Sequence, residues 1–392
     1  MVPSSIRSRR RLALISVASL GWAFSFGVGA PLAALWLKQA GANGWAIGLN
    51  TSVYYLGVAL AAPFLPRLMV RHNRACIIAG MLIDALTTAA FPLVSGEIAW
   101  HGLRLIGGVG TALSLIPMET LINHDAPPDR RSRDFAVYAF CVALGIGLGS
   151  LVGLLVYPIA PLLAFAIGGF VTFSAILPVW FGAPIACRYE ESAGGDPLPW
   201  RSGLMGFGTA WVQGFLEGGT ITFLSIYLLG RGYSEAGTGG LMGGLFAGVV
   251  LAQLPLACLA DRLGRLRVVL ACHVLVLVGL ACMPFTPWTW LLVGLLFVLG
   301  ASNGAMYPLG LALLGERISP SAMARANAWY LACNCAGSLS GPILIGLAID
   351  AFGMNAMFIV CGAAVLLVVG TWLLLGKGRE SGRETVPERV AA

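Results

Sequence analysis

Long apolar runs separated by short turns dominate this chain. A helix needs about 20 apolar residues to cross the hydrocarbon core of a bilayer. Turns between the runs are marked by glycine, proline and charged residues, which interrupt helices. Runs of this length predict twelve transmembrane helices, at residues 12–37, 45–66, 75–94, 97–122, 134–157, 162–183, 202–229, 238–260, 268–286, 288–314, 326–350 and 355–376. The pattern therefore predicts an all-α membrane protein.

The second half of the chain repeats the first. An offset of 191 residues aligns glycines, arginines and a proline, and after a shift of one residue an offset of 192 aligns a tyrosine, a cysteine and further glycines. Gene duplication leaves this kind of internal self-similarity. The aligned pairs include Gly48 with Gly239, Arg71 with Arg262, Arg74 with Arg265, Tyr138 with Tyr330, Gly145 with Gly337 and Gly149 with Gly341.

The repeat predicts two pseudo-symmetric six-helix bundles. The longest polar break between apolar runs lies at the middle of the chain and is expected to connect the bundles. The last residues are charged and lack aromatic side chains, so we expect them to be disordered. The predicted parts are an N-terminal segment 1–11, a first bundle 12–183, a connector 184–201, a second bundle 202–376 and a tail 377–392.

Composition and charge support this class and set the orientation. Of the 392 residues 58% are hydrophobic and 10% are charged, whereas soluble domains have about 25% charged residues. The net charge of +7 could indicate a nucleic-acid partner. However, nearly all lysines and arginines fall in alternate loops, which is the bias of cytoplasmic loops in membrane proteins. We therefore expect a multi-pass protein of the inner membrane with both termini in the cytoplasm. We expect it to be a monomer surrounded by lipid, with no nucleic-acid partner.

A charged turn joins the runs 238–260 and 268–286. Gly264 can adopt the left-handed conformation that ends a helix, and Asp261 can offer its carboxylate to the N-terminus of a neighbouring helix. The order Asp261-Arg262-x-Gly264-Arg265 resembles the loop signature of the major facilitator superfamily. The resemblance implies a cytoplasmic gate, formed with Arg71 and Arg74 of the first repeat. The alternative is a tight turn whose charges only set topology.

Further motifs extend this resemblance over residues 12–376. Arg104-x-x-Gly107-Gly108-x-Gly110 resembles a helix motif that the superfamily associates with proton coupling. Two series of small residues, Gly145, Gly149 and Gly153 in one helix and Gly337, Gly341 and Pro342 in another, let helices approach closely. We expect them where the two halves touch. Two departures are notable, because the first-half loop has Asn73 as its turn residue without an acidic partner, and Ser150 replaces the proline of the antiporter motif. The nearest pattern is that of a bacterial inner-membrane branch.

Four charged residues lie inside the predicted spans, away from their terminal residues: Asp84, Arg104, Glu119 and Glu217. A charge at the centre of a transmembrane helix costs about 2.5–3.5 kcal/mol, so its default interpretation is functional. Glu217 shares one helix face with Gln213 and Thr220. We predict that its carboxylate carries protons or cations; the alternative is a hydrogen bond that only packs two helices.

The other three charges have alternatives of their own. Asp84 and Arg104 are predicted at similar depths, within reach of an ion pair, which could couple to protons or simply fix helix register. Glu119 lies near the cytoplasmic end of its helix. It could release protons into the inner vestibule or pair with Arg71 or Arg74.

Aromatic and amide residues on the predicted cavity helices could contact a solute, although each could equally serve packing. No histidine or cysteine pair has the spacing of a metal site, and no nucleotide-binding or hydrolase motif occurs. We therefore expect that the protein is not an enzyme and uses no cofactor. We expect a proton gradient to be its energy source. The candidate cavity residues are Trp22, Phe26, Asn50, Tyr54, Trp211, Gln213, Thr220, Asn303, Tyr307, Trp329, Tyr330 and Asn334.

The resemblance and the isolated carboxylates together predict a secondary active transporter with the major facilitator fold. Its small-molecule substrate would be an amphiphilic, neutral or cationic organic compound, with export favoured. One alternative is proton-coupled or facilitated uptake of a metabolite such as a sugar or small acid. Another is a membrane sensor or lipid-handling protein built on the same scaffold.

Overall fold

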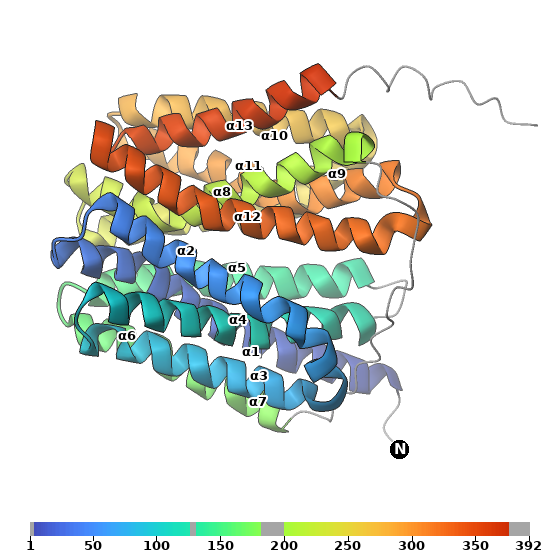
Figure 1. Ribbon diagram of the computed structural model, residues 1–392, viewed down its shortest axis with the longest axis horizontal. Helices are drawn as coiled ribbons and strands as arrows, with labels where there is room; N and C mark the ends of the chain where they lie inside the picture. Colours follow the sequence, from blue (N-terminus) through green and yellow to red (C-terminus); the bar gives the residue numbers. More distant parts are fainter. Residues whose placement is uncertain (1–3, 126–130, 182–199, 376–392) are drawn as a thin grey trace, which may run out of the picture.

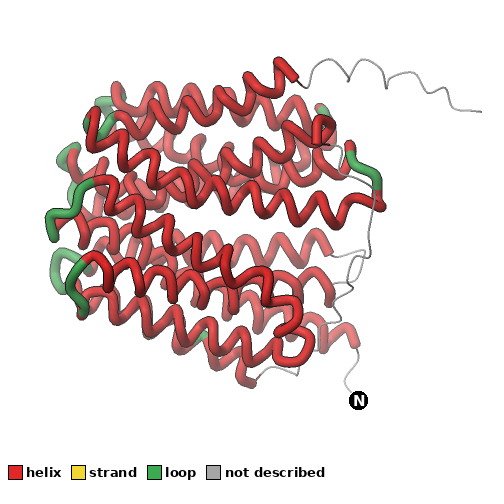
Figure 2. The backbone as a smooth tube through the Cα atoms, viewed as in Figure 1, coloured by secondary structure: helices red, strands yellow, loops and turns green. Residues whose placement is uncertain are grey.

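The computed structural model describes residues 4–125, 131–181 and 200–375. These ranges form α-helices joined by short turns, with no β-strand among them (Figure 1; Figure 2). Twelve helical segments are long and apolar enough to cross a membrane, so the predicted number of spans is confirmed for the described residues. Most of the predicted connector 184–201 and all of the tail 377–392 lie outside these ranges.

The first six spans form one bundle, which occupies the lower half of Figure 1. Three short 3-10 turns occur in the described ranges, and each contains a proline, at Pro63, Pro92 and Pro284. The elements of the first bundle are α1 (Ser4–Gln39), α2 (Gly44–Ala61), η1 (Ala62–Phe64), α3 (Leu65–Ala90), η2 (Phe91–Leu93), α4 (Glu97–Asp125), α5 (Arg131–Val156), α6 (Pro161–Ser174) and α7 (Ile176–Phe181).

The last six spans form the second bundle, in the upper half of Figure 1. Its elements are α8 (Trp200–Gly230), α9 (Glu235–Leu263), α10 (Arg265–Cys282), η3 (Met283–Phe285), α11 (Thr289–Arg317), α12 (Pro320–Phe352) and α13 (Ala356–Leu375).

Two spans depart from a continuous helix. The sixth span breaks at Ala175, between α6 and α7. Pro178 explains the break, because its ring has no N–H to donate and clashes with the carbonyl of Ser174 four residues earlier. In α3 the non-helical residue is His72, with φ −135° and ψ 33°. The prediction that Asn73 is the turn residue is therefore wrong by one position.

The packing repeats in the two halves as the sequence repeat requires. In the first bundle α1 packs against α5 and α2 against α4; in the second α8 packs against α12 and α9 against α11. The halves meet along α2 with α12 and along α5 with α9. These contacts confirm two pseudo-symmetric six-helix bundles.

The glycine series pack helices within each half. A Cβ at Gly149 of α5 would collide with the carbonyl oxygen of Phe24 on α1, and one at Gly341 of α12 with that of Phe215 on α8. Gly145 and Gly153 also face α1, and Gly337 faces α8. The prediction that these glycines lie where the halves touch is therefore wrong. The missing Cβ atoms are used for close approach inside each bundle.

Other residues join the two halves. Gly48 of α2 lies against the backbone of Pro342, so Pro342 does lie at the interface. Its repeat partner Gly239 lies against Leu151 of α5. We call the end of the molecule where α1 begins the base, and the opposite end, to the left in Figure 1, the apex. Three hydrogen bonds join described residues of the two halves in the apical part.

Candidate functional site

A cavity of about 300 Å³ lies between α5 of the first half and the helices of the second half. Ligand pockets in proteins have volumes of about 300–1,000 Å³, so this cavity can hold a small organic molecule. Most of its lining is apolar, and the polar side chains come chiefly from α8 and α11. Six residues singled out in the sequence line it: Glu119, Gln213, Glu217, Thr220, Asn303 and Tyr307.

A chain of amide hydrogen bonds holds Glu217. The Asn334 Nδ2 donates to Gln213 Oε1 at 2.6 Å and to the carbonyl oxygen of Ala210 at 3.1 Å. Gln213 Nε2 in turn donates to Glu217 Oε2 at 2.7 Å. Gln213 and Glu217 are four residues apart on α8, a spacing that brings helical side chains together. Asn334 therefore fixes the orientation of the amide that holds the carboxylate.

Among the described residues, the cavity lining carries negative charge only. Glu119 of α4 and Glu217 of α8 are its two charged residues, and neither a lysine nor an arginine of the described ranges lines it. Glu119 was predicted either to open into the vestibule or to pair with Arg71 or Arg74. Its place in the cavity lining fits the vestibule, and the Arg74 guanidinium lies 5.6 Å from the ring centroid of Trp180. Such a cavity favours a cation over an anion.

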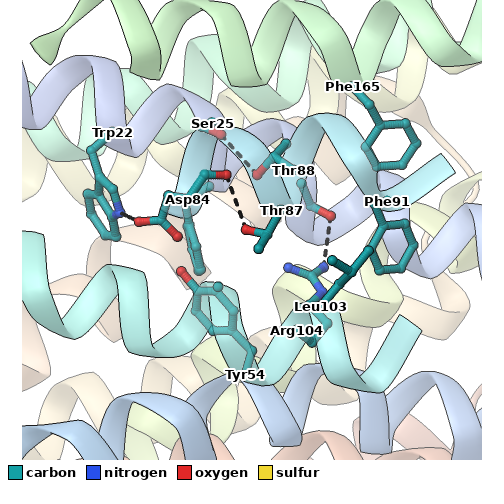
Figure 3. Close-up of a pocket in the computed structure, with 13 residues that line it drawn as sticks. Trp22, Ser25, Tyr54, Asp84, Thr87, Thr88, Phe91, Leu103, Arg104 and Phe165 are labelled. Atoms are coloured by element: carbon teal, nitrogen blue, oxygen red, sulfur yellow. Dashed lines mark hydrogen bonds between the residues drawn. The ribbon is translucent and has the colours of Figure 1, made fainter. Parts of the chain in front are cut away.

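Asp84 lies in a second, small cavity of about 20 Å³ inside the first bundle (Figure 3). Its carboxylate accepts hydrogen bonds from Trp22 Nε1 at 2.7 Å and from Thr111 Oγ1 at 3.1 Å. The Tyr54 hydroxyl is hydrogen-bonded to the same Thr111. Two donors thus satisfy a carboxylate that is 5% exposed.

Arg104 lines the same small cavity but does not pair with Asp84. Its Nη2 donates to the carbonyl oxygen of Gly29 at 2.8 Å and its Nε to Asn50 Oδ1 at 3.1 Å. The guanidinium also lies 5.5 Å from the ring centroid of Tyr54 and from that of Phe91, a cation–π arrangement. Among the described residues no ion pair within 4 Å joins Asp84 and Arg104, so the predicted pair is wrong: Asp84 bonds to residues of α1 and α4, and Arg104 to residues of α1 and α2.

The remaining predicted cavity residues do not line the central cavity. Trp22, Phe26 and Tyr54 line the small cavity of the first bundle. Tyr330 packs behind Tyr307 and donates to its carbonyl oxygen at 2.7 Å. None of these four, nor Asn50, Trp211, Trp329 or Asn334, is among the residues that line the central cavity. The ring of Trp211 packs at a tilt against that of Phe215, and Trp329 contacts Trp200 at the base.

The charged turn at the base makes contacts within the second half. Gly264 has φ +94°, which explains the need for glycine there. Arg265 lies 3.7 Å from Asp261 and 3.3 Å from Glu316 of α11, and it donates to the carbonyl oxygen of Ala312. Asp261 is exposed, as is Arg262, and it caps no neighbouring helix of the described ranges. The side chain of Arg71 lies outside what the structure describes.

Sequence reasoning missed Asp350, which joins the halves at the apex. Its Oδ1 accepts from the Gly44 N–H at 2.6 Å and its Oδ2 from the Trp45 N–H at 2.7 Å. The carboxylate at the end of α12 thus caps the N-terminus of α2. An acidic residue in the last turn of a helix opposes that helix's own dipole, and this signal could have identified it.

Comparison with known proteins agrees with this architecture. The family model described as Major Facilitator Superfamily matches residues 15–234 and 206–391. An "Uncharacterized MFS-type transporter" from Yersinia pestis is 26% identical over 348 residues, covering 86% of this chain and 89% of the relative. The Escherichia coli "Uncharacterized MFS-type transporter YcaD" is 27% identical over 354 residues, covering 88% and 91%. These relatives confirm the predicted resemblance to a bacterial branch of this superfamily.

Solved structures show the same fold. The nucleoside transporter NupG superposes with a TM-score of 0.76 at 16% identity, covering 94% of this chain and 99% of that structure. A bacterial homologue of the human lysosomal transporter Spinster, inward-facing and occupied, gives 0.76 at 15% identity, covering 97% and 99%. The sequence match, the twelve spans and the paired bundles together establish that the chain belongs to the Major Facilitator Superfamily and is a multi-pass membrane transporter.

Proposed function

We propose that this protein exports organic cations in exchange for protons. The observation that carries the proposal is the charge of the central cavity, whose described lining contains Glu119 and Glu217 and no basic residue. A carboxylate in an apolar cavity needs a positive partner. A bound proton and a bound organic cation can each serve as that partner.

Competition for one carboxylate explains the coupling. Glu217 can hold a proton or a cation but not both, so the arrival of one releases the other. With the proton gradient directed into the cell, this exchange drives the cation outward. The Asn334–Gln213 pair holds the Glu217 carboxylate through one of its oxygens, which leaves the other free for a proton or a cation. Binding and release therefore do not require the side chain to find a new partner within the protein.

The orientation follows from the loops. The described helix ends that carry Arg74, Arg262 and Arg265 lie at the base. We therefore infer that the base faces the cytoplasm of a bacterial cell, and that both termini lie on the cytoplasmic side. In the state described here the halves are joined near the apex, through Asp350 and through the 3.0 Å hydrogen bond between Thr222 and Thr51. Transport requires these contacts to break while the base closes. One chain forms the whole cavity, so a monomer suffices.

Proton movement in proteoliposomes tests this proposal. Addition of tetraphenylphosphonium on the side that the base faces should move protons in the opposite direction in the wild-type protein. Glu217→Gln keeps the size of the side chain but cannot titrate, so this movement should fall to the level of empty liposomes. Glu97→Gln removes an exposed carboxylate at the start of α4 and serves as the matched control. Undiminished exchange by Glu217→Gln would contradict the proposal, and flux that ignores the gradient would indicate a facilitator.

A further inference from the structure

The central cavity extends past Glu217 into the interior of the second bundle. On α8, which runs from base to apex, the polar lining residues Gln213, Glu217 and Thr220 are interrupted by Leu216, and beyond Thr220 the lining residues are the apolar Ile221 and Leu224. The rise from Gln213 to Leu224 is about 16 Å at 1.5 Å per residue. The cavity is therefore polar near its middle and apolar toward the apex.

Helices away from the first half close the apical end. Leu280 of α10 and Met357, Phe358 and Cys361 of α13 line the cavity, together with Leu296 of α11. All of these side chains are buried and belong to the hydrophobic core of the bundle. We call this end the apolar chamber, defined by Leu224, Leu280, Leu296, Met357, Phe358 and Cys361.

We propose that the apolar chamber binds the hydrocarbon tail of the transported cation while Glu217 binds its charged head; this inference rests on the proposed function. Apolar cavities in proteins stay dry and bind apolar molecules. Each methylene group buried there strengthens binding by about fourfold. The substrate class is thus a single-chain cationic amphiphile whose tail points toward the apex.

The geometry also sets limits on the substrate. The chamber is closed at the apex by core side chains, so the tail can be only as long as the chamber. An anionic head would face Glu119 and Glu217, and repulsion would exclude it. The chamber lies within the second bundle, so the tail stays with that half while the first half moves. Movement of the halves would therefore change access to the head.

A homologous series of probes tests the tail site. Binding of tetramethylammonium and of butyl-, hexyl-, octyl- and decyltrimethylammonium is measured on the full chain in lipid nanodiscs, with empty nanodiscs to subtract partitioning. Affinity should rise about fourfold per methylene and then stop rising once the tail fills the chamber. Decanoate, which has a similar tail and the opposite charge, should not compete.

Two variants should change, in opposite directions, the limit of the series, which is the tail length at which affinity stops rising. Leu224→Ala enlarges the chamber, so the rise in affinity should continue to a longer homologue. Cys361→Phe fills the chamber, so the rise should stop at a shorter one. The controls are Leu366→Ala and Cys258→Phe, which make the same kinds of change at exposed positions and should leave the limit where it is. Should Cys361→Phe fail to fold, Leu224→Ala still decides.

The two proposals fail in different ways. If affinity stops rising at the same homologue in Leu224→Ala as in the wild type, the tail site is overturned, even if protons still exchange for tetraphenylphosphonium. If the wild-type protein shows no proton exchange, but affinity stops rising at a definite tail length and Leu224→Ala shifts that length, proton coupling is overturned and the tail site stands. A rise that matches partitioning into empty nanodiscs at every chain length would likewise overturn the tail site.

Discussion

The side chain of Gln213 lies between Asn334 and Glu217: its Oε1 accepts from Asn334 while its Nε2 donates to the carboxylate, so Asn334 helps to hold the amide in place. Removing that donor in Asn334→Ala frees the Gln213 amide to move, so its Nε2 is no longer held in place toward the carboxylate. A neutral hydrogen bond is worth about 0.5–1.5 kcal/mol. We therefore expect the rate of proton–cation exchange to fall by about two- to tenfold.

The pH dependence of exchange distinguishes this role from simple packing. Because Asn334 acts through the orientation of Gln213 on Glu217, Asn334→Ala should shift the pH at which exchange is half-maximal as well as lower the rate. Asn355→Ala, the same substitution at an exposed position near the apex, should change neither. A lower rate with an unchanged pH profile would show that Asn334 is needed for packing alone.

Asp84 and Trp22 form a buried pair that a double-mutant cycle can measure. Trp22→Phe removes the N–H that donates to the carboxylate, and Asp84→Asn removes the charge. Hydrogen bonds to charged groups contribute about 1.5–3 kcal/mol, so the two changes should be non-additive by about that amount in unfolding free energy in mixed micelles. Trp290→Phe, at an exposed tryptophan, should add independently to Asp84→Asn. If the effects of Trp22→Phe and Asp84→Asn on the unfolding free energy are fully additive, this hydrogen bond contributes little.

At the scale of helices, matching glycines in the two repeats should behave alike. A Cβ at Gly149 or at Gly341 meets the backbone of the helix packed against it, and neither backbone can move without shifting a whole helix. Gly149→Ala and Gly341→Ala should therefore both lower the thermal stability in detergent. Gly240→Ala is the control, since nothing lies within 4 Å of its Cβ. It should stabilise α9 by about 0.5–1 kcal/mol.

The helices themselves could be predicted because lipid admits few other structures. The repeat was also visible, and Gly145 and Gly337 make equivalent contacts. The rotation of each helix was not predictable, since both its lipid-facing side and its packed side are apolar. For this reason Trp22 and Tyr54, predicted to line the central cavity, turn into the first bundle instead. Glu217 was found because a charge is rare at such a depth.

At the scale of the whole molecule, transport requires the two halves to exchange one set of contacts for another. The hydrogen bonds described between the halves are apical, and α2 with α12 and α5 with α9 form two related seams. The contact between Asp350 and α2 joins residues that are 306 and 305 positions apart in the chain. No local pattern reports such proximity, so the sequence alone could not identify this pair.

Asp350 should set the balance between the apically closed and apically open states. A carboxylate at a helix N-terminus contributes up to about 2 kcal/mol, and this one is available only while the halves are joined. Asp350→Asn weakens the contact, so the equilibrium should shift toward the open state by about 5–30-fold for a loss of about 1–2 kcal/mol.

Spin labels at the exposed positions Ala40 and Asn355, one in each half near the apex, report this shift as a longer distance. Glu235→Gln is the control, because this carboxylate lies in the first turn of its own helix α9 and within one half. It should leave the distance distribution unchanged. If Asp350→Asn also leaves that distribution unchanged, helix packing alone keeps the apex closed, because the seams of α2 with α12 and α5 with α9 remain in that variant.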